Sequence, residues 1–251
     1  DNMVLKNKFG KASSSVVIEE FLDGIELSCF VLTNGKDHKV FPMAKDYKKI
    51  GELDTGLNTG GMGAVSPVPF VDEEFKLKIK EKVILPTIKG IQEENMEYKG
   101  FIFIGLIKVK DEPYVIEYNV RMGDPETEAV FPRIKSDVLE LFLALGTENF
   151  ALLNLEIDPR FTSTVMLVSG GYPLTYQKYF PIIGLNDANE SLVFHAGTKN
   201  ENNSTLTNGG RVLAITSFGE TLKKATENCY REIKKISFKE MYYRKDIGFD
   251  L

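Results

Sequence analysis

The sequence predicts an α+β protein in which a mostly antiparallel sheet with helices is followed by a small second α+β unit. Two pairs of apolar segments are joined by short turns, at Asn34-Gly35 and at residues 111–113, which is typical of β-hairpins. A long amphipathic helical pattern lies between these pairs. After residue 150, short strand-like segments separated by Gly-, Pro- and Asn-rich turns precede a last amphipathic helix, which indicates the second unit.

The composition is that of an ordinary globular chain with one or two domains. The chain has 251 residues, of which 43% are hydrophobic and 27% charged, and its formal net charge is -5. The acidic balance argues against a nucleic-acid-binding protein, which normally has a basic face. No apolar run is long enough for a membrane span, no signal peptide opens the chain, and Cys29 and Cys229 have no partner motif. We therefore expect a cytoplasmic protein with two reduced thiols and no membrane or nucleic-acid partner.

Before residue 110 the chain is expected to contain four strands and a helix. The strands are expected at residues 16–21, 27–33, 39–43 and 101–109, and the helix follows Asp72. Phe75, Ile79 and Val83 recur every fourth residue, which predicts the helix. Pro86 is expected to kink or split it. Residues 101–109 are almost continuously apolar, so both faces of that strand are expected to be buried.

The second half is expected to alternate helices and strands. A helix after Asp124 should stop near Pro132, and Ser136 should cap another helix at residues 137–145. Residues 151–161 would form a connector. Short strands are expected at residues 162–169, 192–196 and 211–216, and a helix at 220–235. His38 and His195 lack partners at metal-ligand or triad spacing, so we expect both to be structural.

The stretch at residues 114–126 most favours a functional site. Residues 114–121 are predicted to form a strand, whose successive side chains point to opposite faces. One face would carry Val115, Glu117, Asn119 and Arg121, and the other, apolar face would pack into a core through Ile116, Tyr118 and Val120. A carboxylate and an amide oxygen suit a hard cation such as Mg²⁺, and a guanidinium suits a phosphate oxygen. A half-solvated strand facing water is the alternative.

The residues after this strand strengthen the hypothesis. Gly123 frees the backbone, Asp124 is suited to cap a helix, and Pro125 is suited to its first position. A strand with metal-type ligands that leads into a helix N-terminus is suited to phosphates.

Two further segments are weaker candidates. Residues 57–64 hold three glycines in four positions after Asn58 and Thr59, so exposed backbone amides could bind a phosphate or carboxylate. A flexible surface loop is the alternative. At residues 19–26, extended backbone groups could bind an adenine edge while a carboxylate holds ribose hydroxyls, although a hairpin with exposed acids is the commoner meaning.

These residues, in this order, resemble the glycinamide ribonucleotide synthetases, which are the phosphoribosylamine–glycine ligases of purine synthesis and belong to the ATP-grasp superfamily. The matching stretches are VVIEEFLDG (16–24), DTGLNTGGMGA (54–64), LPTIKG (85–90), VIEYNVRMGDPET (115–127), SDVLEL (136–141), FHAGT (194–198), TNGGRVL (207–213) and RKDIG (244–248). Several of them are specific to this ligase family rather than to the superfamily.

The resemblance implies an ATP-dependent ligase with Mg²⁺ or Mn²⁺. ATP would phosphorylate the carboxylate of glycine, and the amine of 5-phosphoribosylamine would attack the acyl phosphate without a covalent enzyme nucleophile. The implied metal ligands are Glu117 and Asn119, and the implied catalytic residues are Arg121 and Asp124. The implied nucleotide-binding residues are Glu19, Glu20, Phe21, Leu22 and Glu26. The implied substrate-binding residues are Asp54, Asn58, Thr59, Gly60, Gly61, Met62, Asp124, Pro125 and Glu126.

The resemblance also implies a domain organisation. Residues 1–24 would be the end of the ATP-grasp lid and the hinge, residues 25–150 the ATP-grasp core lobe, and residues 151–251 a small C-terminal α+β domain. Family members carry an N-terminal domain and most of the lid before residue 16, so this chain, which starts without Met, is expected to be a fragment partnered by the remainder of the enzyme.

The sequence departs from the family at three positions of the expected site. Leu57 replaces a usual proline, Val65 an aromatic residue and Glu128 a usual glutamine, which affects details of the substrate loops. Two alternatives remain at this stage. One is a different ATP-grasp ligase, such as a carboxylase of purine or biotin metabolism, and the other is a nucleotide-binding module without turnover.

Overall fold

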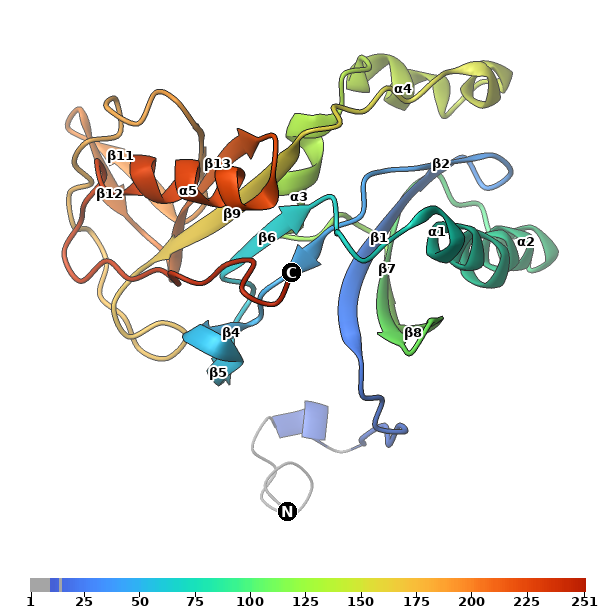
Figure 1. Cartoon of the computed structure of the whole chain (residues 1–251), viewed down its shortest axis with the longest axis horizontal. Helices are drawn as coiled ribbons and strands as arrows, with labels where there is room; N and C mark the ends of the chain where they lie inside the picture. Colours follow the sequence, from blue (N-terminus) through green and yellow to red (C-terminus); the bar gives the residue numbers. More distant parts are fainter. Residues whose placement is uncertain (1–9, 14) are drawn as a thin grey trace.

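The fold consists of two antiparallel sheets that lie side by side, each covered by helices (Figure 1). The computed structural model describes residues 10–13 and 15–251, so residues 1–9 and 14 of the expected lid end and hinge (1–24) lie outside the described residues. A short 3-10 helix, Gly10–Ser13, precedes the first sheet.

The first sheet has the strand order β2-β1-β7-β8. Its strands are β1 (Ile25–Thr33), β2 (His38–Val40), β7 (Gly100–Val109) and β8 (Glu112–Asn119). One face is covered by a helical segment made of α1 (Glu73–Ile79), a π-helical turn (Lys80–Ile84) and α2 (Leu85–Glu93). Ile102, Ile104 and Leu106 of β7 pack in the same apolar cluster as Phe75 and Ile79 of this segment. Pro86 was expected to kink or split this helix. The helical backbone is not split, but a π-helical turn ends at Ile84, just before Pro86, which has no N–H for the helical ladder.

The opposite face of the first sheet is apolar at one end only. Phe30 and Phe103 form a ring pair there, with centroids 5.1 Å apart, and pack in a cluster that includes Leu141 and Phe150. The cluster's covering elements are α3 (Glu126–Val130), the 3-10 helix Phe131–Arg133, α4 (Val138–Ala144) and the 3-10 helix Glu148–Leu152. Further along this face lie the polar side chains of Glu26 and Ser28, together with Ile107 opposite Glu26.

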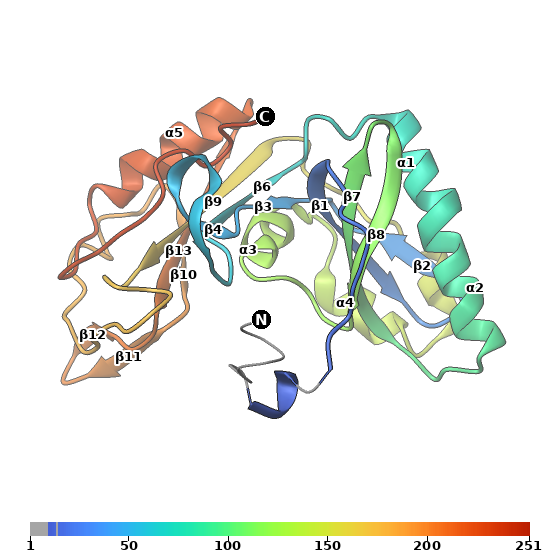
Figure 2. The same ribbon diagram turned by 90° about the horizontal axis from the view of Figure 1, so that it is seen from below.

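The second sheet has the order β10-β13-β9-β6-β3. Its strands are β3 (Lys45–Asp46), β6 (Gly63–Ser66), β9 (Phe161–Val168), β10 (Leu192–His195) and β13 (Arg211–Gly219), and helix α5 (Leu222–Ile233) packs on it. Since β3 and β6 come from before residue 150, the two expected domains share this sheet, and Figure 2 shows α3 between the two sheets. The domain boundaries stay a prediction.

Two small hairpins complete the structure. One is β11 (Thr198–Glu201) with β12 (Ser204–Thr207), which the sequence patterns did not indicate, and the other is β4 (Lys49–Gly51) with β5 (Thr55–Asn58), joined through the 3-10 helix Glu52–Asp54. In the part of the chain that the structure describes, no helix is both long enough and apolar enough to cross a membrane.

Two expected strands differ from the structure. Residues 16–21 are not a strand, and Val17 and Ile18 are 84% and 92% exposed. A β-strand needs a hydrogen-bonded neighbour, and no described strand pairs with these residues. Strand β2, expected at residues 39–43, ends at Val40, because Pro42 cannot donate a ladder hydrogen bond.

The expected helix caps also differ. Asp137, not Ser136, caps α4, since its carboxylate accepts from the backbone N–H groups of Leu139 (2.8 Å) and Glu140 (3.1 Å). Ser136 Oγ instead accepts from the Glu156 N–H at 2.7 Å. Pro125, not Asp124, holds the cap position of α3, and no side chain caps this helix.

Candidate functional site

A β-bulge decides which side chains of β8 share a face. Glu117 lies opposite Gly105, but Val115 lies opposite Leu106, so Ile116 is an extra residue in the ladder. The bulge reverses the alternation of side chains. Val115 therefore lies on the helix-covered side of the sheet, and its expected place beside Glu117 is wrong. Glu117 and Asn119, opposite Gly105 and Phe103, do share a face as predicted.

The expected apolar face of β8 is not buried. Ile116 is 37% exposed, Tyr118 52% and Val120 74%. The reason is that β8 is the last strand of its sheet and the described helices leave its outer side open. The expected packing of these three residues into a core is therefore wrong for the described chain.

The three polar side chains of this stretch lie in a row. Asn119 Nδ2 donates to Glu117 Oε1 at 3.2 Å, and Arg121 Nη2 donates to Asn119 Oδ1 at 3.5 Å. Glycine at position 105 makes room for this row, because a Cβ there would lie 3.1 Å from Glu117 Cγ. The sheet thus presents a carboxylate, an amide and a guanidinium on one open face.

A cation lies among the acidic groups of the same face. Lys48 forms an ion pair with Glu26 of β1, and the charges of Asp46 and Glu117 also act on it. Burial lowers the pKa of the Lys48 ammonium, but the Asp46 and Glu26 carboxylates outweigh burial and raise the pKa above its ordinary value. Lys48 therefore stays charged and partly balances the acids of the site.

Glu126 lies beneath this face. It is 3% exposed, and Ser28 Oγ of β1 donates to its Oε1 at 3.0 Å. Burial, and then the nearby charge of Asp46, raise the pKa of the Glu126 carboxyl to about 7. Glycine at position 123 leaves space for this carboxyl, because a Cβ there would lie 2.5 Å from Glu126 Oε2. The carboxyl is thus positioned to support the loop before α3, and its substrate-binding role stays a prediction.

Arg211 joins the two loops that were expected to surround substrates. Its Nη1 donates to the carbonyl oxygens of Gly60 (2.6 Å) and Asp124 (2.8 Å), and it pairs with Asp124 Oδ1 at 3.1 Å. This ion pair holds the Asp124 carboxylate away from the N-terminus of α3, which explains why it caps no helix. Gly61 has φ +114, and a Cβ there would lie 2.4 Å from Pro125 Cδ. The glycine loop and the loop before α3 are therefore in direct contact.

The glycine loop is held by further contacts. Thr59 Oγ1 accepts from the Gly61 N–H at 2.9 Å, and Tyr172 Oη accepts from the Gly60 N–H at 3.0 Å. Asn58, at the end of β5, is exposed, whereas Met62 is fully buried in an apolar cluster with Met166. The side chain of Met62 thus supports the loop from below.

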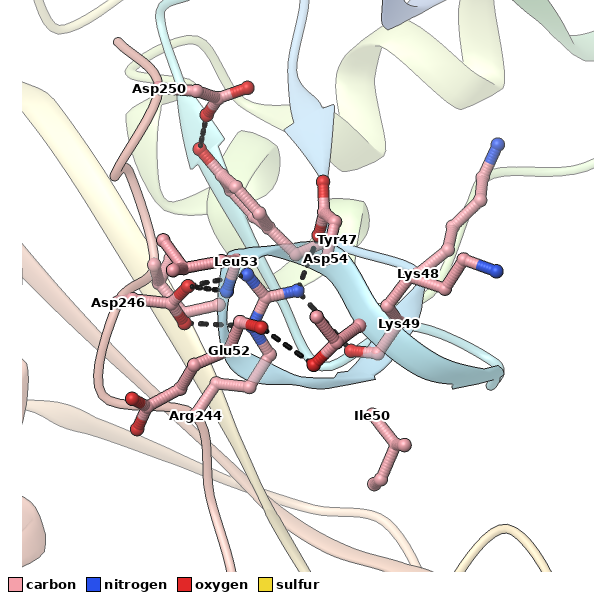
Figure 3. Close-up of polar contacts among 12 residues, drawn as sticks. Tyr47, Lys48, Lys49, Ile50, Glu52, Leu53, Asp54, Arg244, Asp246 and Asp250 are labelled. Carbon is pink, nitrogen blue, oxygen red and sulfur yellow. Dashed lines mark hydrogen bonds and ion pairs between the residues drawn. The ribbon is translucent and has the colours of Figure 1, made fainter.

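Asp54 is tied to the C-terminal segment (Figure 3). Its Oδ1 lies 2.6 Å from Arg244 Nη1, and Arg244 is fully buried. The Nε and Nη2 groups of Arg244 donate to the two oxygens of Asp246 at 2.8 Å each. Burial lowers the pKa of Arg244, but the hydrogen bonds to Asp246 and Asp54 raise it above its ordinary value. This cluster anchors the β4–β5 hairpin to the chain's last residues, and substrate binding by Asp54 stays a prediction.

The expected nucleotide-binding residues are only partly brought to this face. Glu26 lies on it beside Lys48, whereas Glu19, Glu20 and Phe21 are exposed in the extended segment before β1, and Leu22 is half-buried. The sequence-based selection missed Ser28, Asp46, Lys48 and Arg211. For Ser28 a signal existed, because it alternates with Glu26 along β1, and Arg211 stands in the stretch TNGGRVL.

Comparison with protein-family models decides the relationship. The model described as "Phosphoribosylglycinamide synthetase, ATP-grasp (A) domain" matches residues 1–127, and that of the C domain of the same synthetase matches residues 162–250. The chain belongs to the phosphoribosylglycinamide synthetase family. Its fold is accordingly an ATP-grasp A domain followed by the C domain of this family, as the sequence predicted.

Individual relatives agree with this assignment. The chain is 44% identical to a phosphoribosylamine–glycine ligase of Fusobacterium nucleatum over 99% of the chain and 59% of the relative. It is 45% identical to that of Vibrio parahaemolyticus over 99% of the chain and 58% of the relative. The chain thus spans less than two thirds of these relatives.

Solved structures give the same picture. The crystal structure of a phosphoribosylamine–glycine ligase from Thermotoga maritima matches with a TM-score of 0.82 and 34% identity, covering 98% of this chain and 61% of that one. Urea carboxylase of Kluyveromyces lactis matches with a TM-score of 0.64 and 12% identity over 89% of this chain and 19% of that one, which is a likeness of fold alone.

We predict that Arg244→Met lowers the free energy of unfolding by about 3–5 kcal/mol, because it leaves Asp54 and Asp246 without their buried partner. Chemical denaturation measures this change. Arg231→Met is the control, since Arg231 pairs with Glu190 at the surface and its loss should cost under about 1 kcal/mol. The buried Glu232 lies 3.9 Å from Arg231 Nε but keeps Lys235 as a closer partner at 2.7 Å in this variant. A similar, small effect of both substitutions would contradict the role given to Arg244.

We predict a pH-dependent stability difference between the parent chain and Glu126→Gln. The folded-state pKa of Glu126, about 7, exceeds its ordinary value of 4.5, so its contribution is fully present below pH 4.5 and is lost as the pH rises through 7. The parent should therefore lose about 3 kcal/mol relative to the variant over this range, at about 1.4 kcal/mol per pKa unit. Denaturation between pH 4.5 and 8 measures the difference, and parallel curves for the two proteins would refute it.

Proposed function

We propose that this chain is the ATP-grasp core and C-terminal part of a phosphoribosylamine–glycine ligase. The observation that carries the proposal is the row of Glu117, Asn119 and Arg121 on an open sheet face, in a chain that belongs to the phosphoribosylglycinamide synthetase family. The similarity to ligases at 44% and 45% identity supports it. Another ATP-grasp activity, such as a carboxylase, is disfavoured by the match to both domain models of this family.

The proposed reaction has two chemical steps. A carboxylate oxygen of glycine attacks the γ-phosphorus of ATP, so that ADP leaves and an acyl phosphate forms. The amine of 5-phosphoribosylamine then attacks the acyl carbon, and phosphate leaves as the amide of glycinamide ribonucleotide forms. Both steps need positioned charges and exclusion of water rather than a covalent enzyme nucleophile.

Glu117 and Asn119 fit a divalent cation. Their side chains lie on one face, and Asn119 now turns its Nδ2 to Glu117 and its Oδ1 to Arg121. A half-turn of the Asn119 amide would place its oxygen beside the Glu117 carboxylate, and the two oxygens would then suit a hard cation. Among the described residues no group of three or more His, Cys, Asp or Glu side chains could hold a metal by itself. This suits Mg²⁺ or Mn²⁺, which commonly combines one or two protein oxygens with the phosphates of a nucleotide. When bound, the cation would neutralise negative charge on those phosphates.

The remaining side chains have separate tasks in this proposal. Arg121 neutralises charge on the phosphoryl group in transfer, and Lys48 balances Glu26 and Asp46 before the cation binds. Residues 19–22 bind the adenine, partly through backbone groups, and Glu26 lies near the ribose.

The substrate side is formed by two loops in contact. The backbone of residues 58–61, together with Asp124 and Pro125, surrounds glycine and 5-phosphoribosylamine. Glu126, Met62 and Asp54 support these loops from beneath or from the side. We also propose domain limits at residues 24 and 150 and a cytoplasmic location. The chain would work together with the part of the longer relatives that it does not cover.

We predict that the chain binds Mg-ATP and that Glu117→Gln weakens this binding by at least about 10-fold, because a carboxylate ligand is replaced by a weaker neutral one. Isothermal titration with and without EDTA measures the affinity. Glu93→Gln is the control, since Glu93 is an exposed partner of Lys89 on α2.

The activity itself is tested on a longer polypeptide that includes this chain. Phosphate release from ATP should require both glycine and 5-phosphoribosylamine. Release that ignores either substrate, or Mg-ATP affinity that is equal in the Glu117→Gln variant and the parent, would count against the proposal.

A further inference from the structure

Arg211 differs from the other arginines that the structure describes, because both its Nε and its Nη2 groups are left without an acceptor. It is the first residue of β13, and its side chain is 21% exposed at the contact between the glycine loop and the loop before α3. All three of its polar contacts, to Gly60 O, Asp124 O and Asp124 Oδ1, use Nη1. Its Nε and Nη2 groups donate to no acceptor among the residues that the structure describes.

The free side of Arg211 is the one that this protein uses elsewhere to hold carboxylates. Arg244 binds both oxygens of Asp246 through Nε and Nη2 at 2.8 Å each, while its Nη1 binds a carbonyl oxygen and Asp54. Arg160 likewise holds Asp158 through Nε at 3.1 Å and Nη2 at 2.7 Å. Arg211 repeats the Nη1 contacts of Arg244 but lacks the bidentate oxyanion. The Nε and Nη2 pair has the geometry for a carboxylate or a phosphate.

Gly60 lets the guanidinium of Arg211 lie close to the glycine loop. It lies against the flat face of the guanidinium, where a Cβ would be 3.0 Å from Cζ, 3.1 Å from Nη2 and 3.2 Å from Nε. A side chain at position 60 would therefore displace the guanidinium, whereas the Nε and Nη2 hydrogens lie in its plane rather than toward Gly60. Glu128 is the other acid near this group. Burial, and then the charge of Asp124, raise the pKa of its carboxyl, which lessens its repulsion of an anion.

We propose that Arg211 binds an oxyanion of a substrate through its Nε and Nη2 groups. The inference rests on the proposed function, which supplies two possible sources: the carboxylate of glycine and the phosphate of 5-phosphoribosylamine. Arg211 is then a substrate-binding residue in addition to joining the two loops. Substrate binding by Arg211 would therefore depend on the positions of Gly60 and Asp124.

The test measures the equilibrium binding of two stable probes, glycine and ribose 5-phosphate, by ligand-observed NMR titration. The proteins are the parent chain, Arg211→Gln and Arg211→Lys, with Arg160→Gln as the control, since Asp158 already occupies the Nε and Nη2 groups of Arg160. Circular dichroism checks that each variant is folded, and Mg-ATP affinity is measured in parallel.

We expect Arg211→Gln to weaken the binding of one probe at least 10-fold and to leave the affinities for the other probe and for Mg-ATP unchanged. Loss of glycine binding identifies the carboxylate as the bound oxyanion, and loss of ribose 5-phosphate binding identifies the phosphate. Arg211→Lys should also lose binding, because a lysine can keep the contacts to Gly60 and Asp124 but has no bidentate pair. A purely structural role predicts instead that lysine rescues binding.

Two results would overturn the inference. One is equal affinity of the parent and both Arg211 variants for each probe, and the other is a parent chain that binds neither probe. Failure of the parent to bind Mg-ATP, with probe binding still dependent on Arg211, would count against the proposed function and leave the oxyanion site in place.

Discussion

The candidate site depends on the close packing of Glu117 against Gly105. Glycine at position 105 leaves space for the Glu117 side chain along the sheet face, because a Cβ there would lie 3.1 Å from Glu117 Cγ. The bulge at Ile116 then sets Glu117 and Asn119 on the same face, next to Glu26 and Ser28 of β1. A regular ladder counted from the β7–β8 turn would have directed these oxygens toward the other side of the sheet, where apolar residues of α1 and α2 pack.

A second constraint is the shared sheet. The pairing of β6 with β9 fixes the glycine loop, which directly precedes β6, against the C-terminal part of the chain. Arg211 begins the strand next to β9 and reaches Gly60 and Asp124 from there. Arg244 holds the β4–β5 hairpin from the chain's last residues. The proposed substrate side is therefore built by the C-terminal part as much as by the ATP-grasp part, and neither would hold these loops alone.

Much of the fold and part of the candidate site could be predicted from the sequence. The features that could not be predicted have physical reasons. Hydrophobic periodicity predicted the helix after Asp72, a continuous apolar run predicted the buried strand β7, and alternation placed Glu117 and Asn119 together. A bulge has no reliable mark in a single sequence, so Val115 was misplaced. Residues 16–21 have strand-like composition, but composition does not show whether a partner strand is present. Arg211 and Lys48 are far in sequence from their partners, and ordinary cations carry no local signal of such contacts.

The central claim is that the face above Gly105 holds a nucleotide through Glu117 and Asn119. The most direct measurement is a crystal structure of the chain with Mn²⁺ and a non-hydrolysable ATP analogue, with anomalous scattering to locate the metal. The account predicts an anomalous peak within coordinating distance of Glu117 and Asn119 oxygens, with the analogue's phosphates on its other side. A nucleotide bound elsewhere, or a metal held without either residue, would contradict it.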